Sequence, residues 1–243
     1  MGDFQFEDIT NQAGVAHEGN NSTGVVFADV NADNHPDLLI SSLSDGNTLY
    51  INNGAGRFTR REDSGLGESR GAHTMALADI NGDGHLDLYI TNYKIQTARD
   101  VFSAREFAME NTVQMVEGEL QVLPSFSEYF TIVETAEGSF RNEKGEPDDL
   151  YLNLGDGRFE RVDPLQYFFD EDDNPVGLAP DWGLTSTFRD VNGDNSPDLY
   201  VANDFWTPDR LWINRGDGTF RKIDRNAITV SYTHLTLPTI YSV

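Results

Sequence analysis

The sequence Asp79-Ile-Asn81-Gly-Asp83-Gly-His85-Leu-Asp87 is one of three related copies in this chain. The other two are Asp29-Val-Asn31-Ala-Asp33-Asn-His35-Pro-Asp37 and Asp190-Val-Asn192-Gly-Asp194-Asn-Ser196-Pro-Asp198. Positions 1, 3, 5 and 9 of each copy carry side-chain oxygens, and position 7 can add its backbone carbonyl. Calcium takes about 6–8 oxygen ligands in a flexible shell. The spacing predicts about three Ca²⁺ sites with these ligands: Asp29, Asn31, Asp33, His35 (backbone), Asp37, Asp79, Asn81, Asp83, His85 (backbone), Asp87, Asp190, Asn192, Asp194, Ser196 (backbone) and Asp198.

An EF-hand is the first alternative, but it needs a bidentate Glu at position 12 and a helix on each side. Position 12 is Ile40, Ile90 or Val201, each within a short apolar run that predicts a strand. The loops are therefore expected to join two strands. The second alternative is an Asp/Asn/Gly turn without metal. This metal-free alternative applies best to the first loop, where Ala32 and Asn34 replace glycines. Positive φ is expected at Gly82, Gly84 and Gly193, and next most readily at Asn34 and Asn195.

The loop belongs to a longer repeated unit, which is the pattern of repeat architectures. An apolar strand precedes each loop and a second strand follows it. A third strand comes next and ends at Asn52, Asn153 or Asn214. A glycine turn then leads to a fourth strand that starts at Phe58, Phe159 or Phe220. Four short strands joined by tight turns make one blade of a β-propeller, so we expect an all-β protein.

The repeats divide the chain into blade 1 (residues 17–66), blade 2 (67–163) and blade 3 (164–229). Residues 1–16 are expected to supply the outer strand of a preceding or closing blade, centred on residues 6–10. An insertion at 91–147 interrupts blade 2. Residues 99–120 predict a helix there, and residues 129–133 and 138–140 predict a hairpin. A second, smaller insertion spans residues 163–181.

Propellers close with about four to eight blades, so three blades indicate a fragment of a larger protein. Residues 230–243 follow no blade pattern and resemble translated sequencing-adapter read-through. We therefore treat them as a non-native tail and exclude them from the fold.

The composition narrows the possible partners. The formal charge is −24, with 41 acidic and 17 basic residues. Nucleic acid and anionic membrane surfaces both attract basic proteins, so neither is an expected partner. The chain has no cysteine, which rules out disulfides. It also has no apolar run long enough to span a bilayer and no signal peptide.

Two sets of segments resemble a known family. The segments Ala28-Asp29-Val-Asn31 with Asp37-Leu-Leu-Ile40, and Ala78-Asp79-Ile-Asn81 with Asp87-Leu-Tyr-Ile90, are similar to FG-GAP/VCBS repeats, the blades of integrin α-like propellers. The resemblance covers roughly residues 4–229. A narrower likeness, to the ASPIC/UnbV group related to cartilage acidic protein, rests on Leu150-Tyr-Leu-Asn153-Leu-Gly-Asp-Gly157-Arg-Phe159 and Leu211-Trp-Ile-Asn214-Arg-Gly-Asp-Gly218-Thr-Phe220.

The resemblance implies a seven-bladed propeller that is secreted or on the cell surface. It places Ca²⁺ in the loop between the first and second strands of a blade, at the positions given above. It also implies interaction and adhesion roles, with an unknown protein or glycan as the ligand. The chain departs from the family in its few blades, its long insertion and its lack of a C-terminal ASPIC domain.

Two functions follow from the sequence. The leading one is a non-catalytic, calcium-binding module for extracellular interactions. The alternative is a propeller-based carbohydrate-active enzyme, either a polysaccharide lyase or a hydrolase, which needs two carboxylates across a cleft. The regular carboxylates here repeat in every blade, whereas catalytic residues should be unique, and no G-x-S-x-G or H-E-x-x-H motif occurs. His73 is expected to be a packing or turn residue. Unique candidates for ligand binding are the insertion at 91–147 and the segment Asn203-Asp204-Phe205-Trp206. The alternatives are that the insertion only covers the outer edge of its blade, and that the aromatic residues form a wedge between blades.

Overall fold

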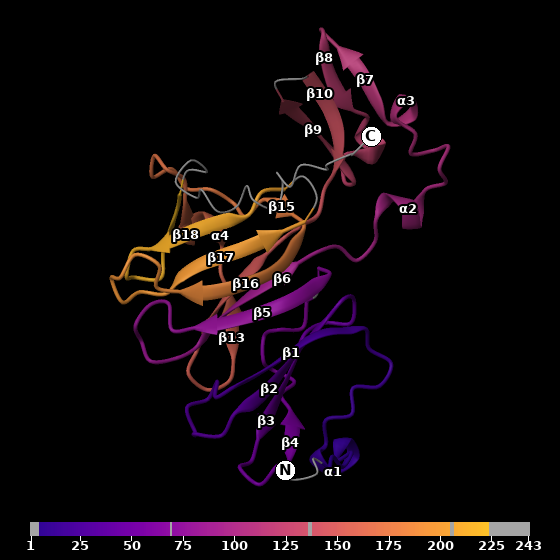
Figure 1. The fold of residues 1–243 in the computed structure, drawn as a ribbon. Coiled ribbons are helices and arrows are strands. Elements are labelled where there is room, and N and C mark those ends of the chain that lie inside the picture. Colours follow the sequence, from indigo (N-terminus) through magenta and orange to yellow (C-terminus); the bar gives the residue numbers. More distant parts are fainter. Residues whose placement is uncertain (1–4, 69, 136–137, 205–206, 224–243) are drawn as a thin grey trace, which may run out of the picture.

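The computed structural model describes residues 5–68, 70–135, 138–204 and 207–223 (Figure 1). Its main body consists of three sheets, and each contains four antiparallel strands from one repeat. The first sheet has the order β1-β2-β3-β4. These strands are β1 (Ser22–Ala28), β2 (Asp37–Ser42), β3 (Thr48–Asn52) and β4 (Phe58–Arg60). Each strand therefore pairs with the next one in the sequence, as expected for one repeat.

The second and third sheets repeat this order. The second contains β5 (Ala72–Ala78), β6 (Asp87–Asn92), β12 (Asp149–Asn153) and β13 (Phe159–Arg161). The third contains β16 (Gly183–Arg189), β17 (Asp198–Asn203), β18 (Arg210–Asn214) and β19 (Phe220–Lys222). A short strand, β14 (Phe168–Phe169), lies parallel to β19 at its edge. The strands predicted for the three repeats are confirmed, and they form separate sheets.

The register is also the same in all three sheets. The last residue of the first strand pairs with position 9 of the loop, as Ala28 with Asp37 and Ala78 with Asp87. Every first strand has a register shift near its start, between Ser22 and Gly24 in β1 and at the equivalent places in β5 and β16. A bulge increases the local twist of a strand. The repeated sequence thus produces a repeated local distortion as well as repeated strands.

The sheets pack face to face, with their first strands β1, β5 and β16 side by side (Figure 1). One apolar core joins the first and second sheets and includes Leu39, Leu49, Leu88, Ile90 and Tyr151. Another joins the second and third sheets and includes Tyr89, Leu150, Leu199, Trp212 and Phe220. A β-sheet must bury its apolar faces against other elements, and here each sheet is covered by its neighbour in the sequence.

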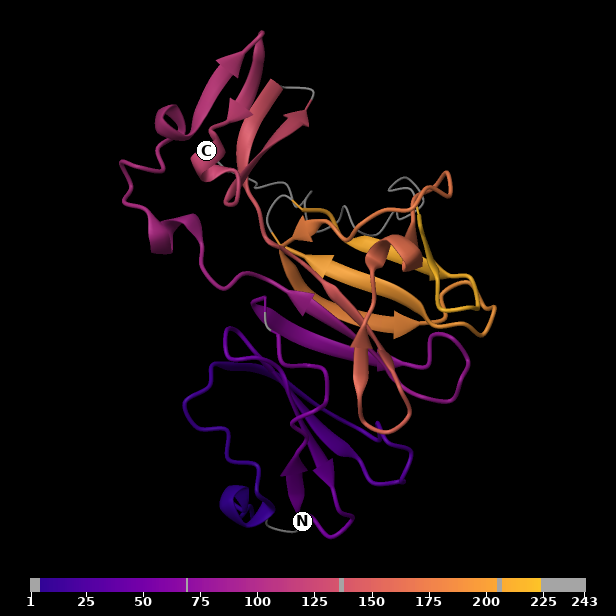
Figure 2. The same cartoon turned by 180° about the vertical axis from the view of Figure 1, so that it is seen from behind.

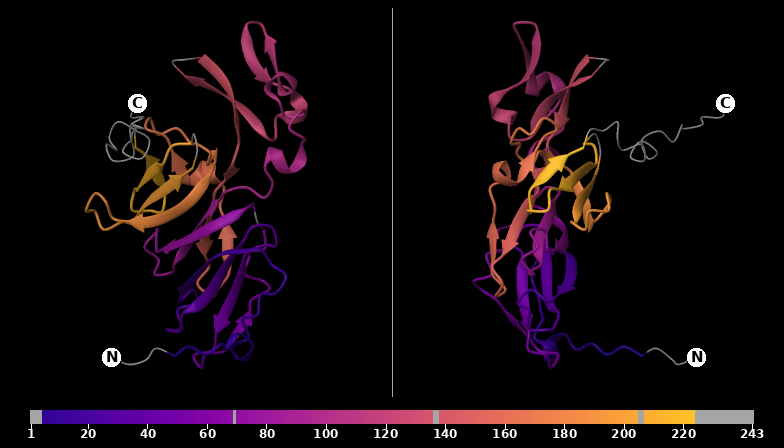
Figure 3. Two further views of the ribbon diagram at one scale, coloured as in Figure 1. Left: turned by 45° about the vertical axis from the view of Figure 1, so that its right-hand side comes forward. Right: turned by 90° about the vertical axis from the view of Figure 1, so that its left-hand side faces the viewer.

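The insertion in the second repeat stands away from the stacked sheets (Figures 1 and 2). Two further views show the same separation (Figure 3). The insertion contains two hairpins and three short helical turns. These elements are α2 (Ala98–Val101), α3 (Met109–Thr112), β7 (Val113–Val116), β8 (Glu119–Val122), η1 (Pro124–Phe126), β9 (Phe130–Thr135) and β10 (Gly138–Glu143). At its base, β11 (Glu146–Pro147) pairs with β15 (Pro180–Asp181).

The helix predicted over residues 99–120 is wrong. The structure has only the two four-residue helices α2 and α3 in this range, followed by the β7–β8 hairpin. The hairpin turn lies at Glu117 and Gly118, whose φ values are 52° and 90°. Positive φ at two successive residues is the geometry of a tight hairpin turn, and the neighbouring valines favour strand. The hairpin predicted nearer the end of the insertion is confirmed as β9–β10.

The outer strand expected at residues 6–10 is also wrong. Residues 5–9 form no strand, and α1 (Thr10–Ala13) follows them. The Asp8 carboxylate accepts the backbone N–H of Thr10 at 2.9 Å, which starts the turn. Gly14, with φ 78°, ends it in the left-handed conformation. An Asp side chain that binds the backbone two residues on favours a turn, and Gly favours the left-handed end of a helix, over an extended strand. The tail proposed at residues 230–243 lies outside the described residues.

Candidate metal centres

The three loops share one backbone path. Positions 4 and 6 have positive φ in every copy. The values are 59° at Ala32, 76° at Gly82, 82° at Gly193, 68° at Asn34, 88° at Gly84 and 67° at Asn195. The predicted left-handed positions are confirmed, and Ala32 joins them although alanine is disfavoured there. The path is therefore set by the whole repeat and not by glycine alone.

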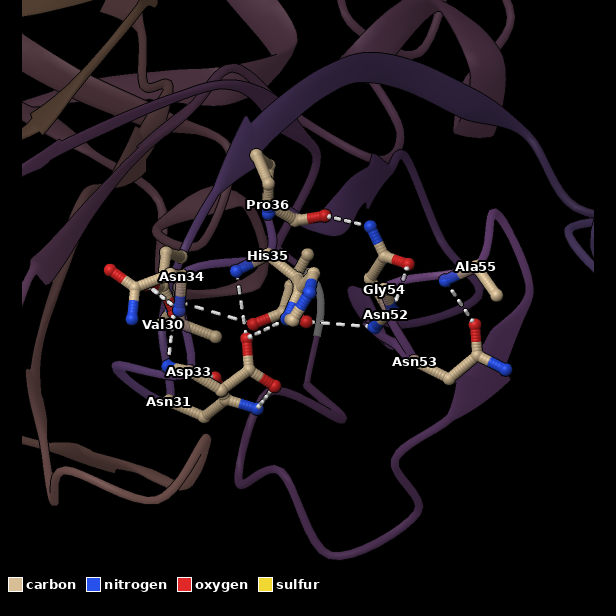
Figure 4. Close-up of polar contacts among 12 residues, drawn as sticks. Val30, Asn31, Asp33, Asn34, His35, Pro36, Asn52, Asn53, Gly54 and Ala55 are labelled. Carbon is tan, nitrogen blue, oxygen red and sulfur yellow. Dashed lines mark hydrogen bonds and ion pairs between the residues drawn. The ribbon is translucent and has the colours of Figure 1, made fainter.

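Side chains at positions 1, 3 and 5 turn inward and bind the loop's own backbone. In the second loop, Asp79 accepts the N–H groups of Gly82 at 2.8 Å and Gly84 at 2.9 Å. Asn81 Oδ1 accepts the N–H of Asp83 at 3.0 Å, and Asp83 Oδ1 accepts that of His85 at 2.8 Å. Figure 4 shows the corresponding contacts in the first loop. The third loop repeats them.

The aspartate at position 9 is buried and bridges two parts of its sheet. Asp87 is 0% exposed. One of its oxygens accepts the N–H of Ile80 at 3.2 Å, and the other accepts the N–H of Asn153 at 2.9 Å. Asp37 and Asp198 make the same pair of contacts. Position 9 therefore joins the start of the loop to the end of the third strand.

The asparagine that ends the third strand links one sheet to the loop of the preceding sheet. Asn153 Nδ2 donates to the carbonyl of Val30 in the first loop at 2.9 Å. Asn214 Nδ2 donates to the carbonyl of Ile80 in the second loop at 2.8 Å. Sequence reasoning placed these asparagines at strand ends but gave them no role. Their recurrence in every repeat, at Asn52, Asn153 and Asn214, was the signal that could have shown it.

Position 7 packs against the glycine turn of the same sheet. A Cβ atom placed on Gly155 would lie 2.7 Å from Nε2 of His85. Gly155 also has a φ of 84°, so both space and backbone conformation require glycine. The side chains of His35 and Ser196 face Gly54 and Gly216 in the same way. The Gly-Asp-Gly turn and the loop thus form one packed unit.

The carboxylates of the first two loops influence one another. The pKa of Asp87 is raised to about 6, mainly by burial, with a smaller contribution from the negative charges of Asp83 and Asp79. Asp37 has a raised pKa for the same reasons, with burial again the largest cause. Like charges held near one another disfavour ionisation. A cation between them would remove this repulsion.

The donor set fits calcium in its chemistry, because it consists of carboxylate, amide and carbonyl oxygens. Each carboxylate oxygen that accepts one N–H retains a further lone pair for a ligand bond. Within residues 5–223 as described, no group of three or more His, Asp or Glu side chains is already gathered closely enough to hold a metal ion.

Other predicted site residues have structural partners. His73 lies in β5, and its Nδ1 hydrogen-bonds the carbonyl of Leu184 in the third sheet at 2.7 Å, which confirms a packing role. Asp204 accepts the Tyr93 hydroxyl at 3.1 Å. Phe205 and Trp206 lie outside the described residues.

One buried carboxyl outside the loops resembles a catalytic group at first sight. Burial raises the pKa of Asp148 to about 7. Its oxygens accept the Tyr89 hydroxyl at 2.8 Å and the Asn92 N–H at 2.7 Å. The third sheet repeats this arrangement with Asp209, Tyr200 and Asn203. Because it recurs in the second and third sheets, the arrangement closes the end of the second strand there and is not a unique catalytic site.

The FG-GAP-like repeat family matches residues 29–90 and 190–239, which include all three loops. The chain therefore contains FG-GAP-like repeats. Such repeats mediate protein interactions, are generally non-catalytic and are typical of extracellular proteins. A search of curated proteins found no match to the chain. None of the helices in the described ranges is long and apolar enough to cross a membrane.

Proposed function

We propose that this chain forms part of a calcium-stabilised β-propeller that serves as a non-catalytic module for extracellular interactions. The observation that carries the proposal is the identical construction of the three loops. Each has the same two left-handed positions, the same inward-turned oxygens and the same buried aspartate. In a turn without metal, asparagine could accept the same backbone N–H groups. The use of three acidic side chains in every copy therefore favours a cation.

The exposed faces of the outer sheets support the propeller architecture. Val30 and Ile80, at loop position 2, are each 1% exposed beneath the next sheet, whereas Val191 is 54% exposed. At the other side of the stack, Phe27 is 60% exposed, although its equivalent Leu77 packs against the preceding sheet. Both outer faces thus carry exposed apolar side chains at positions that are buried where two sheets meet. Further blades on these faces would continue the stack into a ring.

Calcium is proposed to act on stability. Without a cation, the coupled carboxylates repel one another, so binding to the folded loops stabilises them by mass action. Sites in extracellular modules have dissociation constants of about 10⁻⁴–10⁻³ M. At a calcium concentration 100 times the dissociation constant, one site contributes about 2.7 kcal/mol. This metal would brace the hairpin between the first two strands of each sheet and leave ligand recognition to the surfaces where the sheets differ.

The decisive experiment is thermal unfolding in calcium, in magnesium and in excess EDTA. We expect calcium to raise the melting temperature by several degrees, with EDTA reversing the rise and magnesium giving a smaller one. Equal melting temperatures in calcium and EDTA would refute the metal proposal. Turnover of anionic polysaccharides, measured beside an Asp204→Ala variant, tests the carbohydrate-active enzyme as the alternative. The proposed localisation is secreted or cell-surface, the proposed ligand is a protein or glycan, and the narrower ASPIC/UnbV relationship remains a prediction.

A further inference from the structure

A cavity of about 130 Å³ lies between the second and third sheets, away from the three loops. The second sheet and the segment before β12 contribute Tyr89 and Asp148, and the third sheet contributes Arg210, Trp212 and Lys222. Residues 176–179 and Asp181, from the connection between β13 and β16, form another wall. This connection is the second insertion seen in the sequence.

The connection is specific to this pair of sheets. The first and second sheets are joined by residues 61–71, whereas the second and third are joined by the longer segment 162–182. Tyr151 and Arg161 occupy the places of Trp212 and Lys222 one sheet earlier. They line a separate hollow there, whose walls include Gly65 and Glu68. The walls supplied by residues 176–181 therefore have no counterpart of equal length between the first two sheets.

Charged groups around the cavity already have partners, and Asp170 accepts hydrogen bonds from Asn174. Arg210 binds Asp181 through two contacts, Nε to Oδ2 at 2.8 Å and Nη2 to Oδ1 at 3.1 Å. Lys222 Nζ lies 3.1 Å from Glu171 Oε1. Asp148 accepts two hydrogen bonds, and burial raises its pKa, so it takes up a proton readily near neutral pH. A charged ligand would have to break these pairs, which favours a neutral one.

The same groups keep capacity for further hydrogen bonds. Guanidinium has five N–H donors and ammonium has three, more than the contacts above use. The carboxylate oxygens of Asp148 and Asp181 also have lone pairs left. A hydroxyl group both donates and accepts, so it can bind both kinds of partner at once. The apolar part of the wall comes from residues 176–179 and from Trp212, which packs edge-on against Phe168.

We propose that this cavity binds a small neutral polyol of about the size of glycerol. A cavity of about 150 Å³ in another protein holds benzene, which has six non-hydrogen atoms like glycerol, so a hexose with twelve is too large for this cavity of about 130 Å³. Pockets at contacts between structural units, with apolar walls and a few polar groups, are common ligand sites. None of the lining residues is a proposed calcium ligand, so this inference does not depend on the metal proposal.

The test is binding to the full chain by calorimetry and tryptophan fluorescence, with glycerol and erythritol as the neutral probes and a hexose as the control that is too large for the cavity. Acetate and ammonium serve as the charged probes, and each titration is made in calcium and in EDTA. We expect saturable binding of at least one neutral probe in both conditions and none of the charged ones. Binding of no neutral probe, or only of charged probes, would overturn the proposal.

Gly177 offers a variant that fills the cavity at little cost to the fold. It lines the cavity, its φ is not in the left-handed region, and a Cβ there meets nothing within 4 Å. Gly67 has the same properties in the connection between the first two sheets. We expect Gly177→Phe to weaken binding by about tenfold or more and Gly67→Phe to leave it unchanged, with both variants melting like the parent. Lys222→Met, which removes donors without filling the space, should also weaken binding. Unchanged affinity in both Gly177→Phe and Lys222→Met contradicts the assignment.

Discussion

Asn214 donates from its Nδ2 to the carbonyl of Ile80, 134 residues earlier in the chain, at 2.8 Å. Asn214 is 1% exposed and makes three further hydrogen bonds: to Asp198, to Pro197 and from Gly216. All of its hydrogen-bonding groups are thus used, and one of them reaches the loop of the neighbouring sheet. The loop is therefore part of the contact between sheets as well as a candidate metal site.

Asn214→Ala should lower the free energy of unfolding by about 1–3 kcal/mol, because it leaves buried polar groups without partners. Asn153→Ala should act in the same way, since Asn153 binds the carbonyl of Val30. Asn52 is the matched control, because its Nδ2 donates to Pro36 within its own sheet. Urea denaturation of the three variants measures the difference. A loss in Asn52→Ala as large as in Asn214→Ala would show that the contact between sheets contributes little.

Mutation of the two kinds of aspartate in a loop should change the melting temperature in different ways. Asp79 is a half-buried proposed ligand, so Asp79→Ala should remove about one third of the calcium-dependent rise in melting temperature, one of three sites being lost. Its effect in EDTA should be smaller than that of Asp87→Ala, because the N–H groups that it leaves lie in the exposed loop. Asp87 is buried and holds two backbone N–H groups, so Asp87→Ala should lower stability in EDTA as well, by about 1–3 kcal/mol. Thermal unfolding with and without EDTA tests this, and identical profiles for the two variants would contradict it.

The sequence predicted most of the repeated structure, because repetition makes each weak local signal count three times. Strand order, loop position and left-handed residues all followed from the pattern around Asp79–Asp87. The buried role of Asp87 could not be predicted, because the spacing of the four oxygen-bearing residues does not distinguish a buried aspartate from an exposed ligand. The contact from Asn153 to Val30 was also missed, because it joins residues 123 apart and depends on how the sheets stack.

The segments that occur only once were predicted less well. Residues 99–120 are rich in helix-forming residues, yet the turn at Glu117 and Gly118 made them partly a hairpin. Residues 6–10 resembled the fourth strand of the repeats, but the hydrogen bond that the Thr10 N–H donates to the Asp8 carboxylate starts a helical turn instead. In both places short-range hydrogen bonds and turn geometry outweighed composition. Because these segments occur only once, there was no second copy of the sequence with which to compare them.

Stability should fall as the pH rises from about 4 to about 7. Burial raises the pKa of Asp148 from an ordinary 3.8 to about 7, so the folded state binds this proton more tightly than the unfolded chain. The proton on Asp148 contributes fully to the free energy of unfolding when the pH is below the pKa of Asp148 in the unfolded chain. This contribution is lost as the pH rises through the pKa of Asp148 in the folded protein. Asp87, with a pKa of about 6, changes in the same direction. Unfolding in EDTA across this range tests the slope, and Asp148→Asn should flatten it. An equal slope in that variant would contradict the assignment to Asp148.

The first loop offers a way to strengthen a candidate metal site. The backbone φ of Ala32 is 59°, at a position where the other loops have glycine. This conformation costs an alanine residue roughly 1–2 kcal/mol. Ala32→Gly should therefore stabilise the folded loop, by less than that amount because glycine also gains freedom in the unfolded chain. Gly82→Ala, the reverse change in the second loop, should destabilise it by a similar amount. Calcium titration and thermal unfolding of both variants measure the effect. If Ala32→Gly destabilises the protein, the left-handed position does not limit this loop, and its departure from the other two has another cause.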